Sequence, residues 1–306
     1  SDWFRHGHDG DKVYDSVILH IVGEADGEVT RTNGEVIPQM IVSCPERIKM
    51  HYYELCVSDC YPACYPILRS LPKLTVHSWL SALQTELLEQ KAKLIGARLE
   101  HCNNNWEDVF FITLARNYGF GLNGDAFEAW AELLPFRALD KHRNDLFQIE
   151  ALFYGMAGLF EDTFLKEEQK DEYCLRLSKE FHYLQRKFEI FRVMDATLWR
   201  FLRLRPDNFP HIRLAQLAYL YQKGDKLFSR LLEAETLAEV RILLSTRTSV
   251  YWENHYIFGR TSPQREKLLG EQSKDLIIIN TVVPFLYTYG LDKADEGMCE
   301  HDGRFL

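Results

Sequence analysis

The sequence lacks the short motifs that mark the commonest enzyme families. It contains no Gly-x-Gly-x-x-Gly, no P-loop, no Gly-x-Ser-x-Gly and no His-Glu-x-x-His, the signatures of nucleotide-binding proteins, hydrolases and zinc proteases. No apolar run approaches the roughly 20 residues of a membrane-spanning helix, and the N-terminus lacks the charged-then-apolar pattern of a secretion signal. These absences predict a soluble protein that has no membrane partner.

Paired cysteines and excess positive charge are missing as well. The seven cysteines are an odd number without the spacing of a small secreted disulfide framework, which favours reduced thiols in the cytoplasm. The net charge of −9 excludes a basic field over the whole surface, such as drives non-specific nucleic-acid binding, but leaves a local basic patch open. Aromatic residues are plentiful, with 19 Phe, 15 Tyr and 6 Trp among 306 residues, and they predict a compact, packed core.

The first 75 residues carry the strand pattern. Runs rich in β-branched residues lie on both sides of the Asn33-Gly34 pair, and this pair tolerates the positive φ angles of a type I′ turn, so a hairpin is predicted there. Prolines between residues 44 and 75 interrupt any long element and favour short helices and a connector. The strands are expected near residues 16–23, 27–32 and 35–42.

Helical spacing begins near residue 76 and continues almost to the end. Asn105 is placed to cap a helix from Trp106, and Gly224 to close another. The predicted fold class is therefore α+β and predominantly α, with a small N-terminal α/β segment (1–75) that holds a partial sheet or hairpin, and a large helical domain (76–306). The predicted helices span residues 76–101, 105–120, 124–133, 145–161, 166–190, 195–204, 211–222, 225–245 and 262–289.

The first candidate site is a cluster of metal-ligand residue types near the start of the chain. His6 and His8 are two imidazoles one residue apart, and Asp11 adds a carboxylate, so the set could bind a divalent metal or take part in catalysis. It departs from the His-x-His-x-Asp-His of metallo-β-lactamases, because Gly10 and Asp11 stand where that motif has Asp and His. The favoured alternative is a polar loop that caps the following helix.

The second candidate is a set of polar residues in helices that are otherwise apolar. Glu150 lies in a nearly all-apolar helix, and a buried carboxylate needs a cationic or hydrogen-bonding partner, or else takes up a proton. Arg213 and Gln216 lie in a similar helix. We therefore predict a buried ionic cluster in which an arginine pairs with Glu150 or another buried acid. Its arginines would come from Arg200, Arg203, Arg205 and Arg213.

The same arginines have a second interpretation, phosphate binding. A helix is predicted to start near Pro210, where free N–H groups and the helix dipole favour anions, and Arg213 in the first turn would add a fork of donors. Lys141, His142 and Arg143 could join this site if the fold brings them close. Structural pairing is the favoured interpretation of the two.

Several segments together resemble one protein family. They are His6-Gly-His8, Tyr14-Asp-Ser-Val-Ile-Leu-His20, Lys141-His-Arg143, Gln148-Ile-Glu-Ala151, Arg203-Leu-Arg-Pro206, Asn208-Phe-Pro210, Arg213-Leu-Ala-Gln216 and Ile279-Asn-Thr281. The chain resembles, over nearly its whole length, a family of uncharacterised bacterial proteins grouped as domain of unknown function 2851. That resemblance by itself implies no activity.

The resemblance does carry an implication for the N-terminal part. Longer members of that family have an acidic, strand-rich N-terminal stretch that looks like a PD-(D/E)XK nuclease core, in which an Asp and a Glu hold Mg²⁺ for phosphodiester hydrolysis. In that layout residues 4–23 would supply the helix and strand that follow the metal-binding strands, and we expect sequence to be missing at both ends of this chain. Two function hypotheses follow. One is a nucleic-acid-processing protein with a metal-dependent nuclease-like core, and the other is a noncatalytic helical binding or scaffold protein.

Overall fold

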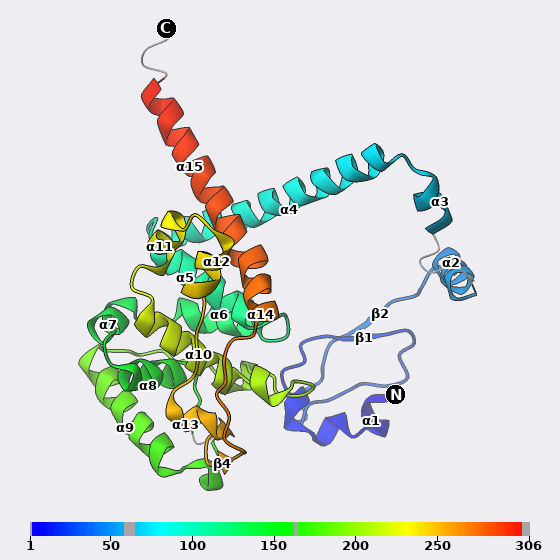
Figure 1. Cartoon of the computed structure of the whole chain (residues 1–306). Coiled ribbons are helices and arrows are strands. Elements are labelled where there is room, and N and C mark those ends of the chain that lie inside the picture. The colour runs from blue at the N-terminus through cyan, green and yellow to red at the C-terminus, as the bar shows by residue number, and fades with distance from the viewer. Residues whose placement is uncertain (1, 58–64, 162–164, 302–306) are drawn as a thin grey trace. The chain divides into compact units, whose positions relative to one another are not determined.

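The computed structural model describes residues 2–57, 65–161 and 165–301, and it shows a mostly helical chain with two small sheets (Figure 1). The predicted α+β class, predominantly α, is confirmed. The chain divides into two compact units, residues 1–80 and 81–306, and the division falls within one long helix, α4 (Lys73–His101).

The smaller unit carries a pair of short parallel strands. β1 (His20–Val22) pairs with β2 (Gln39–Ile41), so that His20 lies opposite Gln39 and Val22 opposite Ile41. Parallel strands need a crossover rather than a tight turn, and residues 23–38 form the connection here. The helical elements of this unit are α1 (Asp2–Arg5), η1 (His8–Gly10), η2 (Lys12–Tyr14), α2 (Glu46–Cys56), α3 (Tyr65–Ser70) and the start of α4.

The connection between the strands contains a turn at Asn33-Gly34, but not of the predicted type. The Arg31 N–H donates to the Glu35 carbonyl and the Gly34 N–H donates to the Arg31 carbonyl, both at 2.9 Å. Gly34 has a positive φ of +81°, whereas Asn33 does not. A left-handed glycine after a type I turn is the usual three-residue hairpin loop. The hairpin turn is therefore present, and the type I′ prediction is wrong. The strands predicted near 16–23 and 35–42 are shorter than predicted, and the strand predicted near 27–32 is reduced to an isolated bridge between Thr30 and Val36.

The smaller unit buries few side chains. Over residues 2–57 and 65–80, its hydrophobic core consists of three buried residues and two half-buried ones, namely Trp3, Val29, Ile37, Tyr14 and Val17. Ile21 on β1 and Ile41 on β2 remain 60% and 63% exposed. Parallel sheets are usually covered on both faces, and the residues that the structure describes provide no such cover for this pair.

The larger unit is built from helices around one aromatic core. Its helices after α4 are α5 (Trp106–Tyr118), α6 (Gly124–Glu132), α7 (Phe136–Lys141), α8 (Leu146–Met156), η3 (Glu167–Gln169), α9 (Glu172–Lys187), η4 (Ala196–Leu198), η5 (Pro206–Asn208), α10 (Pro210–Lys223), α11 (Leu227–Glu233), α12 (Leu237–Leu243), α13 (Val250–Glu253), α14 (Glu271–Ile277), the π-helix η6 (Ile278–Val282) and α15 (Val283–His301). β3 (His255–Ile257) and β4 (Arg260–Thr261) form a small antiparallel sheet.

The centre of this unit is formed by α5, α8 and α10, which are buried on most sides. Rings pack edge to face across it, for example Trp130 against Phe153 with centroids 4.8 Å apart. Local sequence sets the helix ends: the Asn105 side chain accepts from two N–H groups at the start of α5, as predicted, and Gly224 follows the end of α10. The prediction that the apolar helix after residue 145 is central is confirmed.

Four predicted helices differ from those found. The predicted helix 166–190 is divided into the short η3 and α9. Residues 195–204 form only the short η4 before an irregular stretch, and the predicted helix 225–245 is divided into α11 and α12. Residues 262–270 form no helix, because their N–H groups bond to distant carbonyls. Arg265 donates to Glu253 and Leu269 to Thr246. Tertiary contacts override the helical spacing there.

Candidate functional site

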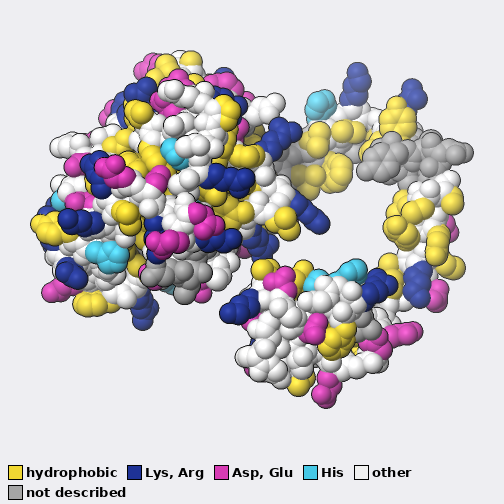
Figure 2. All heavy atoms as spheres, turned by 90° about the horizontal axis from the view of Figure 1, so that it is seen from below, with side chains coloured by type: hydrophobic (Ala, Val, Ile, Leu, Met, Phe, Trp, Pro, Cys, Tyr) yellow, Lys and Arg dark blue, Asp and Glu magenta, His cyan; other side chains and the backbone are white. Residues whose placement is uncertain are grey.

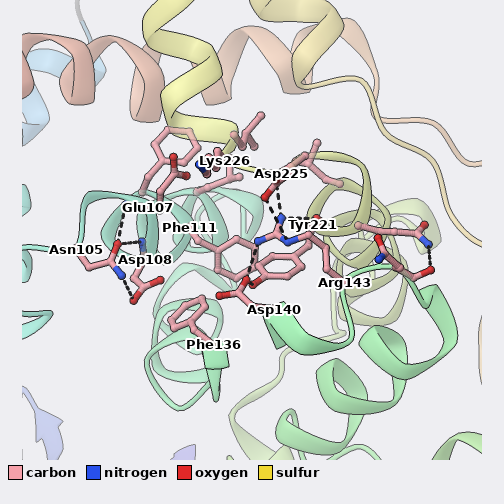
Figure 3. Close-up of a pocket in the computed structure, with 17 residues that line it drawn as sticks. Asn105, Glu107, Asp108, Phe111, Phe136, Asp140, Arg143, Tyr221, Asp225 and Lys226 are labelled. Carbon is pink, nitrogen blue, oxygen red and sulfur yellow. Dashed lines mark hydrogen bonds and ion pairs between the residues drawn. The ribbon is translucent and has the colours of Figure 1, made fainter. Parts of the chain in front are cut away.

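The larger unit contains a pocket of about 580 Å³ lined by α5, α7, α10 and the start of α11 (Figure 3). Its walls combine aromatic rings with carboxylates that come from different elements. The rings belong to Phe111, Phe136 and Tyr221, and the inner carboxylates to Glu107, Asp108 and Asp140.

Arg143 links α7 to the end of α10 on one side of the pocket. Its guanidinium donates to the Asp140 carboxylate at 2.8 Å and to the carbonyls of Tyr221 and Gly224 at 3.0 and 3.1 Å. It also lies 4.3 Å from the centre of the Tyr221 ring, whose hydroxyl donates to the same Asp140 oxygen at 2.7 Å. Asp140 is thus engaged by the protein's own donors. This corner already binds one guanidinium, by a carboxylate and an aromatic face together.

Glu107 points away from the neighbouring Asp108 and toward α11 (Figure 3). Its carboxylate accepts from the N–H groups of Phe228 at 3.1 Å and Ser229 at 2.9 Å, and from the Ser229 hydroxyl at 2.7 Å. These N–H groups belong to the first turn of α11, where no partner exists within the helix. The role of Glu107 is therefore to attach α11 to α5.

Asp108 is the carboxylate of the pocket that has no cation beside it. The Asn105 side-chain amide donates to it at 2.7 Å, and no ion pair joins it within the ranges that the structure describes. Burial, followed by the charges of Asp140 and Glu107, raises the pKa of Asp108 to about 6. A half-buried carboxylate in this state would be stabilised in its charged form by a nearby cation.

The pocket combines aromatic faces with carboxylates, and two basic side chains, Arg143 and Lys226, also line it. Aromatic faces combined with carboxylates are the arrangement that recognises ammonium and guanidinium groups. No set of three or more His, Cys, Asp or Glu side chains in the described part of the chain is arranged to hold a metal.

Glu150 forms a separate polar centre in the core, and the prediction that it pairs with an arginine is wrong. It is fully buried on α8, and the Tyr173 hydroxyl donates to it in a very short hydrogen bond. Burial raises the pKa of Glu150 to about 7, while the hydrogen bond from Tyr173 acts in the opposite direction. The Tyr173 hydroxyl therefore takes the place of the expected cation, and the carboxyl exists largely in its protonated form below neutral pH.

Arg213 is buried as predicted, but its partners are neutral. Its guanidinium donates to the side-chain amide oxygens of Gln216 at 2.9 Å and Asn208 at 2.6 Å, and it lies 4.4 Å from the centre of the Phe120 ring. Burial lowers the pKa of Arg213 to about 10. Both terminal nitrogens of the guanidinium are bound from within the protein, so the structure gives no support to a phosphate held by Arg213.

The remaining members of the predicted cluster do not meet Glu150 or Arg213 in one ionic site. Lys141 lies over the Phe188 ring, and His142 contacts Gln148 and, at 3.3 Å, Lys187. Three arginines have exposed side chains instead, namely Arg200, Arg203 and Arg205. On the face of the larger unit seen in Figure 2, basic and acidic side chains are interspersed, so that face carries no broad field of one sign.

The histidine cluster near the start of the chain serves local structure. Asp11 accepts from the Val13 N–H at 3.0 Å and so caps η2, as the polar-loop alternative predicts. The His8 ring packs on Tyr14 with centroids 4.0 Å apart. His6 lies 5.8 Å from His8 between ring centroids, and the set forms no metal site in the described residues.

Sequence reasoning identified Arg143 but missed Asp108, Asp140 and Tyr221. Two of these carried a usable signal. Asp108 stands three residues after a predicted cap, and Asp140 stands three residues before Arg143, the spacing of a helical ion pair. Tyr221 lies 81 residues from Asp140, so only the fold could reveal that contact.

A protein-family comparison matches residues 1–306 to a family described as protein of unknown function (DUF2851). The chain belongs to this family. No curated protein and no solved structure matches it. Membership of DUF2851 confirms the resemblance but brings no activity with it, and it lends no support to a nuclease core. No helix within the described ranges is both long and apolar enough to cross a membrane.

Proposed function

We propose that this DUF2851 protein is a noncatalytic helical binding protein whose pocket receives a cationic side chain or a small organic amine. The observation that carries the proposal is Asp108. It is a half-buried carboxylate with a pKa of about 6, it has no cation beside it in the described structure, and it lies in a cavity walled by Phe111, Phe136 and Tyr221. A bound ammonium or guanidinium group would supply the missing charge.

The test is a calorimetric titration of the full chain with two cationic probes and one neutral probe. N-acetyl-lysine amide and N-acetyl-arginine amide are expected to bind at pH 8, whereas N-acetyl-norleucine amide, which lacks the charge, is not. Because only the ionised carboxylate attracts a cation, binding should weaken as the pH falls through about 6, where Asp108 takes up a proton. Asp108→Asn should weaken binding about tenfold or more.

Glu233→Gln is the matched control, because it removes one negative charge from the exposed part of α11, outside the pocket. It should leave binding unchanged. Equal binding of the norleucine probe, or unchanged binding by Asp108→Asn, would contradict the proposal.

Nucleic-acid processing is a second candidate, supported by a specific observation in the smaller unit. β1 and β2 pair in parallel and expose apolar side chains, a state more typical of part of a larger covered sheet than of a finished one. In the larger unit the exposed Arg200, Arg203 and Arg205 would be available to phosphates. Free thiols at Cys44, Cys56, Cys102 and Cys174 agree with a cytoplasmic location, which also remains a proposal.

Cleavage of labelled DNA or RNA in the presence of Mg²⁺ or Mn²⁺ tests this second candidate. If it holds, the double variant Arg203→Ala/Arg205→Ala should weaken nucleic-acid binding and reduce its salt dependence. Absence of both binding and cleavage would leave the binding-protein proposal alone.

A further inference from the structure

A row of leucines on α4 faces solvent within the larger unit. Leu83, Leu87 and Leu94 are 42%, 49% and 59% exposed, and their spacing puts them on one face of the helix. Every side chain from Ser81 to Leu87 is exposed, so this part of α4 extends beyond the helices that pack around it (Figure 1). Solitary exposed leucines are ordinary, whereas a row at coiled-coil spacing on an unsupported helix is typical of a docking face.

The two flanks of this leucine row differ. On one flank, Lys91 is committed to the protein itself, because its ammonium donates to the Asn280 side chain at 2.7 Å. On the other flank, Glu86 and Lys93 are exposed and stand one residue before Leu87 and Leu94 respectively. Opposite charges therefore lie seven residues apart along the open flank.

This charge order identifies the partner that fits. If a second α4 lies antiparallel, with its Leu83 beside Leu94 of the first, then Glu86 of each copy comes opposite Lys93 of the other. Both flanking pairs are then attractive. A two-fold interface requires such self-complementarity, since each contact occurs twice. In a parallel dimer in register, Glu86 and Lys93 would each lie level with the same residue of the other copy.

A cavity beside Leu94 adds space for the second helix. It measures about 470 Å³. Its lining is mixed: Leu94, Ala97, Cys102 and Ile112 are joined by Arg98, His101, Glu128 and Glu132. In the antiparallel arrangement this cavity lies where Leu83 of the second copy arrives. Leu83 would contact the apolar part of this lining, as an apolar side chain of a helix anchors in a groove.

We propose that the leucine row of α4 (Leu83, Leu87 and Leu94) is the surface through which two copies of this chain dimerise, with the two α4 helices antiparallel. Sedimentation equilibrium of the full chain should show a reversible monomer–dimer equilibrium. Leu87→Glu should abolish the dimer, because it places a charge in the centre of the apolar row. Leu175→Glu, at a comparably exposed leucine on α9, is the control and should leave the dimer intact.

A charge exchange tests the antiparallel register. Glu86→Lys and Lys93→Glu should each weaken the dimer about tenfold, because like charges then face each other across the two-fold axis. Mixing the two variants should restore association as a heterodimer, in which each flanking pair is again of opposite sign. The measurement is sedimentation of the mixture with one variant fluorescently labelled.

Three results would overturn the proposal. One is a chain that stays monomeric at the highest accessible concentration. Another is a dimer that survives Leu87→Glu with unchanged affinity. The third is a mixture of the two charge variants that associates no better than either variant alone. Circular dichroism spectra that match the unsubstituted chain would show that a lost dimer does not reflect unfolding.

Discussion

The two units of this protein differ in how much apolar surface they bury. The larger unit surrounds one continuous aromatic core and buries charged and polar groups within it, among them Glu150 and Arg213. Among the described residues of the smaller unit, three apolar side chains are buried in its core, and both strands carry exposed isoleucines. Because buried apolar area is the main source of stability, the larger unit can tolerate costly internal polar groups that the smaller unit could not.

The largest expected effect on stability comes from replacing one buried tryptophan in each unit and comparing the two losses. Trp130 is completely buried and donates to the Phe153 carbonyl at 3.0 Å, so Trp130→Ala should destabilise the larger unit by about 3–5 kcal/mol. Trp3→Ala removes the main ring of the smaller core and should destabilise that unit while leaving the main denaturation midpoint unchanged. The measurement is urea denaturation followed by far-ultraviolet circular dichroism.

The comparison would fail if Trp3→Ala shifted the main denaturation midpoint as far as Trp130→Ala does. That result would mean that the two units unfold as one cooperative body.

A second prediction concerns how the stability of the larger unit depends on the ionisation of the buried Glu150 carboxyl. Because burial raises the pKa of Glu150 from 4.5 to about 7, the folded state binds the proton more tightly, and stability is lost as the pH rises from about 4.5 to 7. Glu150→Gln cannot ionise, so it should be more stable than the unsubstituted chain by about 3 kcal/mol at pH 8 and nearly equal to it at pH 5.

Denaturation curves of both chains across this pH range measure the difference. Other titrating groups, such as the buried His211, are common to both chains and cancel from it. A difference that does not change with pH would show that Glu150 ionises normally in the folded protein.

The smallest expected effect contrasts two helical glycines of the larger unit. A Cβ on Gly155 of α8 would overlap the Phe181 ring, whereas a Cβ on Gly96 of α4 would meet nothing within 4 Å. Gly155→Ala should therefore destabilise by about 1–3 kcal/mol through overpacking. Gly96→Ala should stabilise by about 0.5–1 kcal/mol, because alanine favours the helix. Thermal melts of both variants check the opposite signs, and two shifts of the same sign would contradict the packing described here.

Much of the helical fold could be predicted from local signals, whereas most of the pocket could not. Asn105 and Gly224 set helix ends by contacts within a few residues, so their roles can be predicted from the sequence. The segment 262–270 has helical spacing but bonds to distant carbonyls, and no local rule foresees those partners. The pocket has the same difficulty, because Asp108, Asp140 and Tyr221 belong to three different helices.

The sequence by itself determined the helical class, the central place of the apolar α8 and the burial of Glu150 and Arg213, because these follow from periodicity and from the cost of exposing apolar faces. Tertiary structure alone decided which groups satisfy those buried charges. Tyr173 bonds to Glu150, and amide oxygens bond to Arg213, although the sequence contains cations and carboxylates enough to pair both. A hydrogen-bonding partner is chosen by which side chains the packed helices bring within about 3 Å, and that distance is a property of the fold.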